Sequence, residues 1–188
     1  ISPNTISINA LLLSYSYSTS ANGIDISTCA HIFETLFQKY NLMPDTNSYD
    51  TMLAVCAKAE RSDLAVVYFN KMKQNNLRPD VKSYTCAIDA CAKQADNVNA
   101  EMWFQKMLDD KISPNVTAYT CVIHGHSRNG DVDRASSWFD RLERDLKIIC
   151  ADVITLNTVL DSFAKRGDAN GAEVFLEQYF RKRDVRPN

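Results

Sequence analysis

Four cationic side chains recur at nearly constant spacing along the chain. They are Lys58, Lys93, Arg128 and Lys165, and each follows the previous one by 35 to 37 positions. A row of cations can bind the phosphates of an extended nucleic-acid strand, which arrive once per nucleotide. The alternative is local, because the helix dipole favours a cation at a helix C-terminus. Both interpretations require the four residues to hold one place in a repeated element.

The other reactive side chains do not form a catalytic or metal-binding set. His124 and His126 are two positions apart, and such residues do not share a helix face. The six cysteines lie at 29, 56, 86, 91, 121 and 150, without a CxxC pair. Two pairs of them are 35 positions apart, which predicts reduced packing residues in a repeated core and a reducing compartment. We expect no catalytic residue, metal or cofactor.

The repeated element is visible directly in the sequence. The stretches 44–58, 79–93 and 114–128 begin Pro-Asp or Pro-Asn, carry tyrosine five positions after the proline and end in a cation. A fixed period between 20 and 50 residues is typical of solenoids and repeat arrays. The predicted units are 5–45, 46–80, 81–115, 116–152 and 153–188, with 1–4 as the tail of a preceding unit.

Each unit carries two apolar patterns of helical period. In the second unit, Tyr49, Leu53 and Cys56 fall on one helix face. Ala65, Phe69 and Met72 follow on another. The same spacing returns in later units, so we predict an all-α solenoid of helix–turn–helix repeats, expected to form a right-handed superhelix.

Turn signals separate the two predicted helices. Gly130 and Gly167 suit a left-handed C-terminal position. The residues predicted to cap the second helices are Ser62, Asn97, Asp131 and Asp168. The serine-rich stretch 14–23 predicts a longer loop in the first unit, and 145–151 predicts a bulge or a longer helix in the fourth.

Bulk properties exclude some partners. The 188 residues carry a net charge of −2 and a pI of about 5.9, unlike a basic nucleic-acid domain. No apolar run approaches the ~20 residues that span a membrane. The opening Ile-Ser-Pro-Asn matches residues 112–115, where a unit ends. We therefore expect the chain to be a segment of a longer array.

The repeat resembles the pentatricopeptide repeat family. The resemblance is carried by residues 79–85, Pro-Asp-Val-Lys-Ser-Tyr-Thr, and by Ala-x-x-x-Phe-x-x-Met at 65–72 and 100–107. Tetratricopeptide repeats are the nearest alternative, but they expect a Leu-Gly pair in the first helix. The corresponding sites are Met52-Leu53, Ala87-Ile88 and Val122-Ile123, without glycine.

The resemblance implies single-stranded RNA binding, with about one base read per repeat. The reading residues would be the fifth and last of each unit. These pairs are Asn9 with Asp45, Asp50 with Asp80, Thr85 with Asn115, Thr120 with Asp152, and Asn157 with Asn188. By the family's code they suggest U, an unassigned base, A, G, then C or U. Capping alone would also select an Asp or Asn before a helix.

The second residue of each unit often stacks on a base in this family. Ile6 and Ile154 fit that role, whereas Asn47, Lys82 and Thr117 are polar. Stacking is therefore expected to be weak in the middle units.

Two functions from different classes follow from the resemblance. The first is RNA recognition in organellar RNA processing, stability or translation. The second is a protein-binding scaffold or structural component of a large ribonucleoprotein such as an organellar ribosome. We expect a mitochondrial or plastid location, with a cytoplasmic one as the alternative. A membrane or a small-molecule substrate is not expected as a partner.

Overall fold

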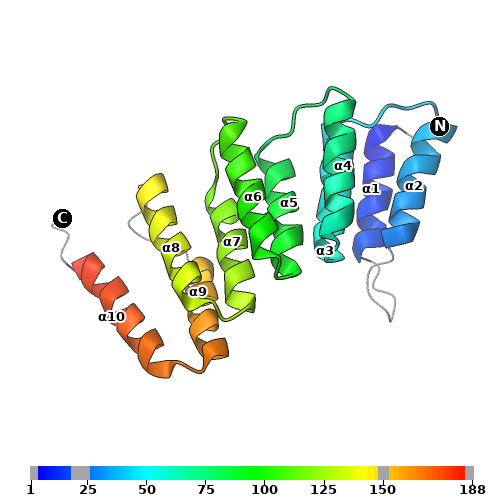
Figure 1. Ribbon diagram of the computed structural model, residues 1–188. Coiled ribbons are helices and arrows are strands. Elements are labelled where there is room, and N and C mark those ends of the chain that lie inside the picture. The colour runs from blue at the N-terminus through cyan, green and yellow to red at the C-terminus, as the bar shows by residue number, and fades with distance from the viewer. Residues whose placement is uncertain (1–3, 18–25, 148–152, 185–188) are drawn as a thin grey trace.

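The computed structural model describes residues 4–17, 26–147 and 153–184, and all of its regular structure there is α-helical. Ten helices follow one another as five pairs (Figure 1). Their bounds are α1 (Thr5–Tyr17), α2 (Ile26–Lys39), α3 (Thr46–Lys58), α4 (Ser62–Gln74), α5 (Val81–Lys93), α6 (Asn97–Asp109), α7 (Val116–Arg128), α8 (Val132–Leu146), α9 (Val153–Arg166) and α10 (Ala169–Asp184). The predicted all-α solenoid is confirmed.

The pairs form two layers. Each of α3, α5 and α7 packs on the odd-numbered helix before it and on the one after it. Within the described chain the backbones of the even-numbered helices approach those of odd-numbered helices closely, whereas successive even-numbered helices meet through side chains. The even-numbered helices stand nearer the viewer in Figure 1. Because the odd-numbered helices lie closer together, they form the shorter, inner side of the array. We call the exposed side of α1, α3, α5, α7 and α9 the inner face.

Aromatic clusters join successive pairs. The ring of Phe69 lies 4.9 Å from that of Tyr84 and 4.6 Å from that of Trp103. One period later, Phe104 lies 4.7 Å from Tyr119 and 4.9 Å from Trp138. The tilted and edge-on geometry is the arrangement that aromatic pairs prefer. Each cluster links the second helix of one unit to both helices of the next.

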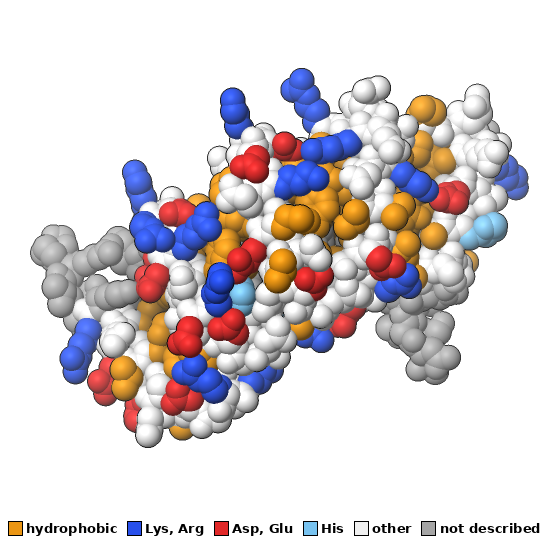
Figure 2. Space-filling view, viewed as in Figure 1, with side chains coloured by type: hydrophobic (Ala, Val, Ile, Leu, Met, Phe, Trp, Pro, Cys, Tyr) orange, Lys and Arg blue, Asp and Glu red, His pale blue; other side chains and the backbone are white. Residues whose placement is uncertain are grey.

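The even-numbered helices form the outer layer of the array, and cations of this layer cover the aromatic clusters. Lys106 Nζ lies 4.6 Å from the centre of the Trp103 ring, and Arg141 Cζ lies 4.7 Å from that of Trp138. Figure 2 views this layer and shows hydrophobic strips between the helices, with both signs of charge interspersed. None of the described helices is long and apolar enough to span a membrane.

Left-handed residues end the helices. Gly130 and Gly167 have φ values of 65° and 72°, which confirms their predicted conformation. Glu60 and Ala95 adopt the same conformation at the equivalent turns without being glycine. In all four turns the next residue's N–H bonds back to a carbonyl five residues earlier, as from Asp96 to Cys91.

Two of the four predicted caps are correct. Asp131 accepts from Arg134 N at 3.1 Å, and Asp168 accepts from Gly171 N at 2.8 Å. Ser62 and Asn97 instead lie inside the first turns of α4 and α6. Asp96 caps α6, and Arg61 precedes α4 without a side-chain cap.

The two irregular segments are described in part. Helix α1 continues through Ser14 to Tyr17, where a loop was expected, and 18–25 lies outside the described residues. Helix α8 extends to Leu146 and ends at a left-handed Lys147, so it is longer than α4 and α6, as one of the two alternatives predicted. The alternative of a bulge falls on 148–152, which lies outside the described residues.

The described cysteines serve packing. None is in a disulfide bond, and Cys29, Cys56 and Cys91 are buried. Burial raises the pKa of the Cys56 and Cys91 thiols to about 12, so both stay protonated at neutral pH. Cys150 lies outside the described residues.

Candidate nucleic-acid interface

The predicted reading and phosphate-binding positions share one side of each first helix. At 100° per residue, the second, fifth, ninth and thirteenth positions of a 13-residue helix fall within one broad face. The third, fourth, seventh, eighth and eleventh point to the core, as the buried Ser83, Tyr84, Ala87, Ile88 and Cys91 of α5 show. The inner face therefore contains the fifth residues of the predicted reading pairs and the predicted phosphate-binding cations.

The fifth residues are not equally accessible. Thr85 and Thr120 are half-buried, and each hydroxyl donates to the backbone carbonyl one turn earlier. Thr120 Oγ1 also lies 2.8 Å from Thr155 Oγ1, the third residue of the next unit. Asn9 is half-buried with Oδ1 buried and unbonded, and Asn157 is exposed.

Asp50 departs from this pattern. Its side chain is 1% exposed, and Ser83 Oγ donates to its Oδ1 at 2.5 Å across the α3–α5 contact. Burial raises the pKa of this carboxyl, and the Ser83 hydrogen bond opposes the rise. The structure places Asp50 as a buried link between repeats, so it is not accessible as the reading residue that the pair with Asp80 suggested, and the base of the second unit stays unassigned.

The last residues are exposed helix caps. Asp45 Oδ1 accepts from Ser48 N at 2.8 Å and Asn115 Oδ1 accepts from Ala118 N at 2.9 Å. Asp80 Oδ1 accepts from Lys82 N and Ser83 N. The capping role and the reading role are therefore compatible, because capping uses one atom of each side chain. Asp152 and Asn188 lie outside the described residues.

One predicted pair lines a hollow on the inner face. Thr85 and Asn115, the pair of the third unit, border a space of about 360 Å³. The second residues Lys82 and Thr117 stand on either side. The remaining lining residues are Asp80, Val81 and Cys86. The two halves of a predicted pair, 30 positions apart in sequence, thus meet at one cavity between α5 and α7.

The cations lie at the ends of the first helices as predicted, and carboxylates face Lys93, Arg128 and Lys165. Lys93 Nζ lies 2.8 Å from Asp89 Oδ2, and Lys165 Nζ lies 2.6 Å from Asp161 Oδ2. Arg128 Nη1 lies 3.2 Å from Glu60 Oε1. Lys58 is exposed at the end of α3.

Family models match most of this chain. A model described as the PPR repeat family matches residues 44–93, and models described as PPR repeat match 82–112, 110–143 and 154–183. The chain belongs to the pentatricopeptide repeat family. The matched PPR segments cover the second and third predicted units in full and most of the fourth and fifth.

Solved PPR structures share the fold. The crystal structure of PPR10 from maize is 22% identical with a TM-score of 0.73, over 96% of this chain and 25% of that one. The structure of PPR10 in complex with an 18-nt psaJ RNA element is 22% identical with a TM-score of 0.76, over 94% of this chain and 25% of that one. The PPR domain of Arabidopsis thaliana protein-only RNase P 1 in complex with tRNA is 16% identical with a TM-score of 0.65, over 86% of this chain and 81% of that one. The chain spans about a quarter of the length of PPR10. No curated protein sequence matches it significantly.

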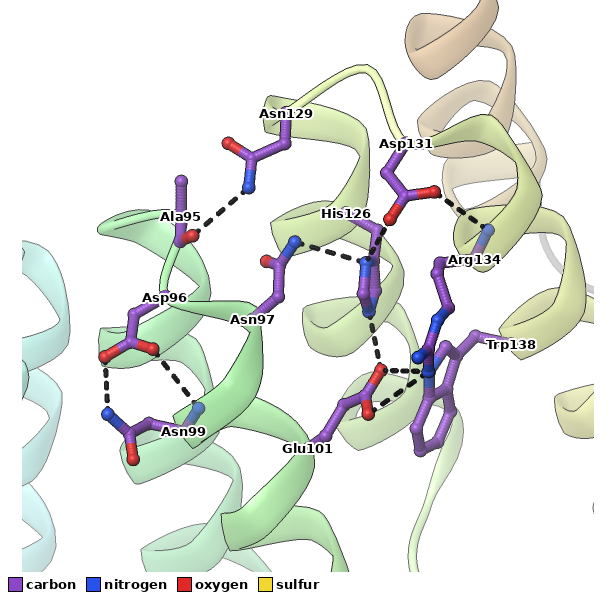
Figure 3. Close-up of polar contacts among 10 residues, drawn as sticks. All are labelled: Ala95, Asp96, Asn97, Asn99, Glu101, His126, Asn129, Asp131, Arg134 and Trp138. Carbon is purple, nitrogen blue, oxygen red and sulfur yellow. Dashed lines mark hydrogen bonds and ion pairs between the residues drawn. The ribbon is translucent and has the colours of Figure 1, made fainter.

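The histidines of the PPR array have separate surroundings. His126 replaces the cysteine found at this place in the two preceding units, and it is buried between α6 and α8 (Figure 3). Its Nε2 lies 2.9 Å from Glu101 Oε1, and its Nδ1 lies 3.1 Å from Asn97 Nδ2. His124 is half-buried, and burial lowers its pKa. Among the described residues, no group of His, Cys, Asp and Glu is arranged to hold a metal ion.

Sequence reasoning missed the acidic partners in these PPR repeats. Asp89 and Asp161 lie four residues before a predicted phosphate-binding lysine. That spacing places an acid and a base on one helix face, so it was a usable signal. Glu60 carried no such signal, because it reaches Arg128 from 68 positions away.

Proposed function

We propose that this PPR segment binds single-stranded RNA along the inner face and reads about one base per repeat. The hollow bordered by Thr85 and Asn115 carries this proposal, because it brings one predicted reading pair to one accessible place. The structures of PPR10 in complex with an RNA element and of the protein-only RNase P 1 PPR domain in complex with tRNA support the same ligand class. These likenesses support the fold directly and the ligand by analogy.

The capping geometry gives a chemical reason for base selection. Asn115 Oδ1 is engaged by Ala118 N, which leaves the amide NH₂ as the group available to a base. A donor fits an acceptor such as N1 of adenine. Asp80 and Asp45 cap through Oδ1, and a carboxylate can offer an acceptor only. An acceptor fits the ring N–H of uracil or guanine.

The proposed target follows from the predicted pairs. Units one, three, four and five suggest U, A, G and then a pyrimidine, from 5′ to 3′. Unit two stays unassigned, because its Asp50 is held by Ser83 inside the array. The corresponding preference is U-N-A-G-Y.

We assign no catalysis to this segment and place it in a mitochondrion or plastid, where it would act in RNA processing, stability or translation. The family resemblance supports the location. A fluorescent fusion of the full-length protein, imaged against organelle markers, tests it, and a purely cytoplasmic signal would favour the alternative.

The test of base reading is a selection from a random RNA pool with the wild type and Asn115→Asp. The substitution keeps an oxygen for the cap and turns the free donor into an acceptor. We expect the preference at the third position to change from A to G, with the other positions unaltered. Asn70→Asp makes the same chemical change at an exposed site of α4 and serves as the control.

A scaffold for protein partners is the second candidate. The paired carboxylates at Lys93, Arg128 and Lys165 favour it, because they weaken the attraction of the inner face for phosphate. An RNA pool without enrichment, together with stable co-purifying proteins, would replace the first proposal with this one.

A further inference from the structure

Two lysines of the inner face are paired within their own helices. Lys93 Nζ and Asp89 Oδ2 are 2.8 Å apart, with side chains 28% and 26% exposed. Lys165 Nζ and Asp161 Oδ2 are 2.6 Å apart, with side chains 40% and 50% exposed. Each lysine thus already has an anionic partner where an RNA phosphate would bind.

The acids occupy one defined place in the repeat. Asp89 and Asp161 are the ninth residues of units three and five. The ninth residues of units two and four are Ala54 and His124. The ion pair is therefore a feature of two units and not a requirement of the fold, since units with alanine or histidine at this place form the same helix pair.

Asp161 is held in place by a second contact. Ser127 Oγ, on the neighbouring helix α7, donates to Asp161 Oδ2 at 3.0 Å. The hydrogen bond from Lys165 and that from Ser127 hold the pKa of Asp161 below its usual range, despite partial burial. The carboxylate is consequently ionised at neutral pH and anchored from two helices.

An anchored carboxylate beside a lysine competes with phosphate in two ways. It must be displaced before the lysine contacts RNA, and its own charge then repels the phosphate. A pair exposed to this degree is weak because solvent screens it, so displacement is possible and the competition is graded.

Phosphate contacts carry affinity but no sequence information, whereas base contacts supply specificity. We infer that Asp89 and Asp161 are specificity-determining residues, which neutralise Lys93 and Lys165 and make RNA binding depend on base contacts. The inference rests on the proposed RNA-binding function. It assigns these two acids the task of suppressing sequence-independent binding.

The experiment compares the wild type with Asp89→Asn/Asp161→Asn. Binding of two fluorescent single-stranded RNAs is measured by anisotropy over a range of salt: a random-sequence pool, and the sequence that the wild type selects. We expect the double variant to bind the random pool about tenfold more tightly. The slope of log K against log salt should become steeper by about one unit. The preference for the selected RNA over the pool should fall.

The matched control is Asp63→Asn/Glu177→Gln. It also removes two carboxylates that pair with arginines, Arg61 and Arg181, but on α4 and α10 of the outer layer. The net charge changes equally. We expect its affinity for the pool to rise much less than that of the inner-face variant.

The outcomes distinguish a failure of this inference from a failure of the proposed RNA binding. Equal gains in both double variants would overturn the inference, because net charge alone would then explain them. An unchanged affinity in the inner-face variant, with a wild type that binds its selected RNA, would also overturn it and leave RNA binding intact. A wild type and variants that all fail to bind RNA would overturn the proposed function as well.

Discussion

Residues at equivalent positions of the repeats have different structural roles. The fifth residue is a buried link in unit two, where Asp50 accepts from Ser83, and a half-buried one in unit four, where Thr120 meets Thr155. In unit three, the third residue of the following unit is Ala118, which has no polar side-chain atom. Thr85 is then left at the border of the hollow. Whether a fifth residue can read a base thus depends on its neighbour in the next repeat.

Asp50 provides a test at the residue scale. Burial raises its pKa, so the folded protein holds this proton to a higher pH than the unfolded chain does. Ionisation therefore lowers stability as pH rises from the ordinary aspartate pKa through the raised value, and the cost persists at neutral pH. Asp50→Asn keeps an oxygen for Ser83 and removes the charge. We expect the free energy of unfolding at neutral pH to rise by about 1 kcal/mol.

Urea unfolding at several pH values checks this expectation. The stability advantage of Asp50→Asn should disappear below pH ~4. There the Asp50 carboxyl of the wild type is protonated, so neither the wild type nor the variant carries a charge at this position. A variant that is less stable than the wild type at neutral pH would show that the Ser83 hydrogen bond outweighs the burial of the charge.

At the scale of the element, helix ends decide how the pairs turn. Four turns of similar geometry join the first helix of a unit to its second helix. Two of them have glycine, at Gly130 and Gly167, whereas the other two have Glu60 and Ala95 with φ values of 53° and 57°. A left-handed conformation costs a non-glycine residue roughly 1–2 kcal/mol. The surrounding hydrogen bonds, such as that from Asp96 N to Cys91 O, hold Ala95 there.

Ala95→Gly should stabilise the protein. Glycine relieves the left-handed strain, and its greater freedom in the unfolded chain offsets part of the gain. We expect about 1 kcal/mol, equivalent to roughly 2–4 °C in Tm for a chain of this size. Ala30→Gly, inside α2, is the control and should lower Tm instead, because glycine disfavours a helix interior. Thermal unfolding followed by circular dichroism measures both, and a lower Tm for Ala95→Gly would contradict the strain argument.

At the scale of the whole molecule, stability is a chain of contacts between neighbours. In such arrays each repeat contacts mainly the next one, so stability is close to a sum of unit and interface contributions. The interface between units three and four depends on Phe104, which is fully buried against Tyr119 and Trp138. Weakening it should uncouple the two sides of the array.

Phe104→Ala is expected to cost about 3–5 kcal/mol and to replace one unfolding transition by two. The two tryptophans, Trp103 and Trp138, lie on either side of this interface, so their fluorescence follows it, whereas circular dichroism follows all helices. Phe33→Ala, at the junction of the first two units, should leave the fluorescence midpoint nearly unchanged. A single coincident transition in Phe104→Ala would show stronger long-range coupling than the contacts suggest.

The repeat, the paired helices and the places of the cations could all be predicted from the amino-acid sequence. Those features depend on local signals, such as the helical spacing of Tyr49 and Leu53 or the Pro-Asp at 79–80, which return with small changes in most units. The capping atoms of Asp45 and Asn115 belong to the same class, because a cap is formed within three residues.

Which of these polar groups remain accessible depends on contacts between repeats, which became visible in the folded chain. The burial of Asp50, the bridge from Glu60 to Arg128 and the bonds of His126 to Asn97 and Glu101 all join residues at least 25 positions apart. Local periodicity places a side chain on a helix face. It does not specify which side chain the neighbouring repeat presents to it, and that partner determines whether a carboxylate or a lysine is free to meet a ligand.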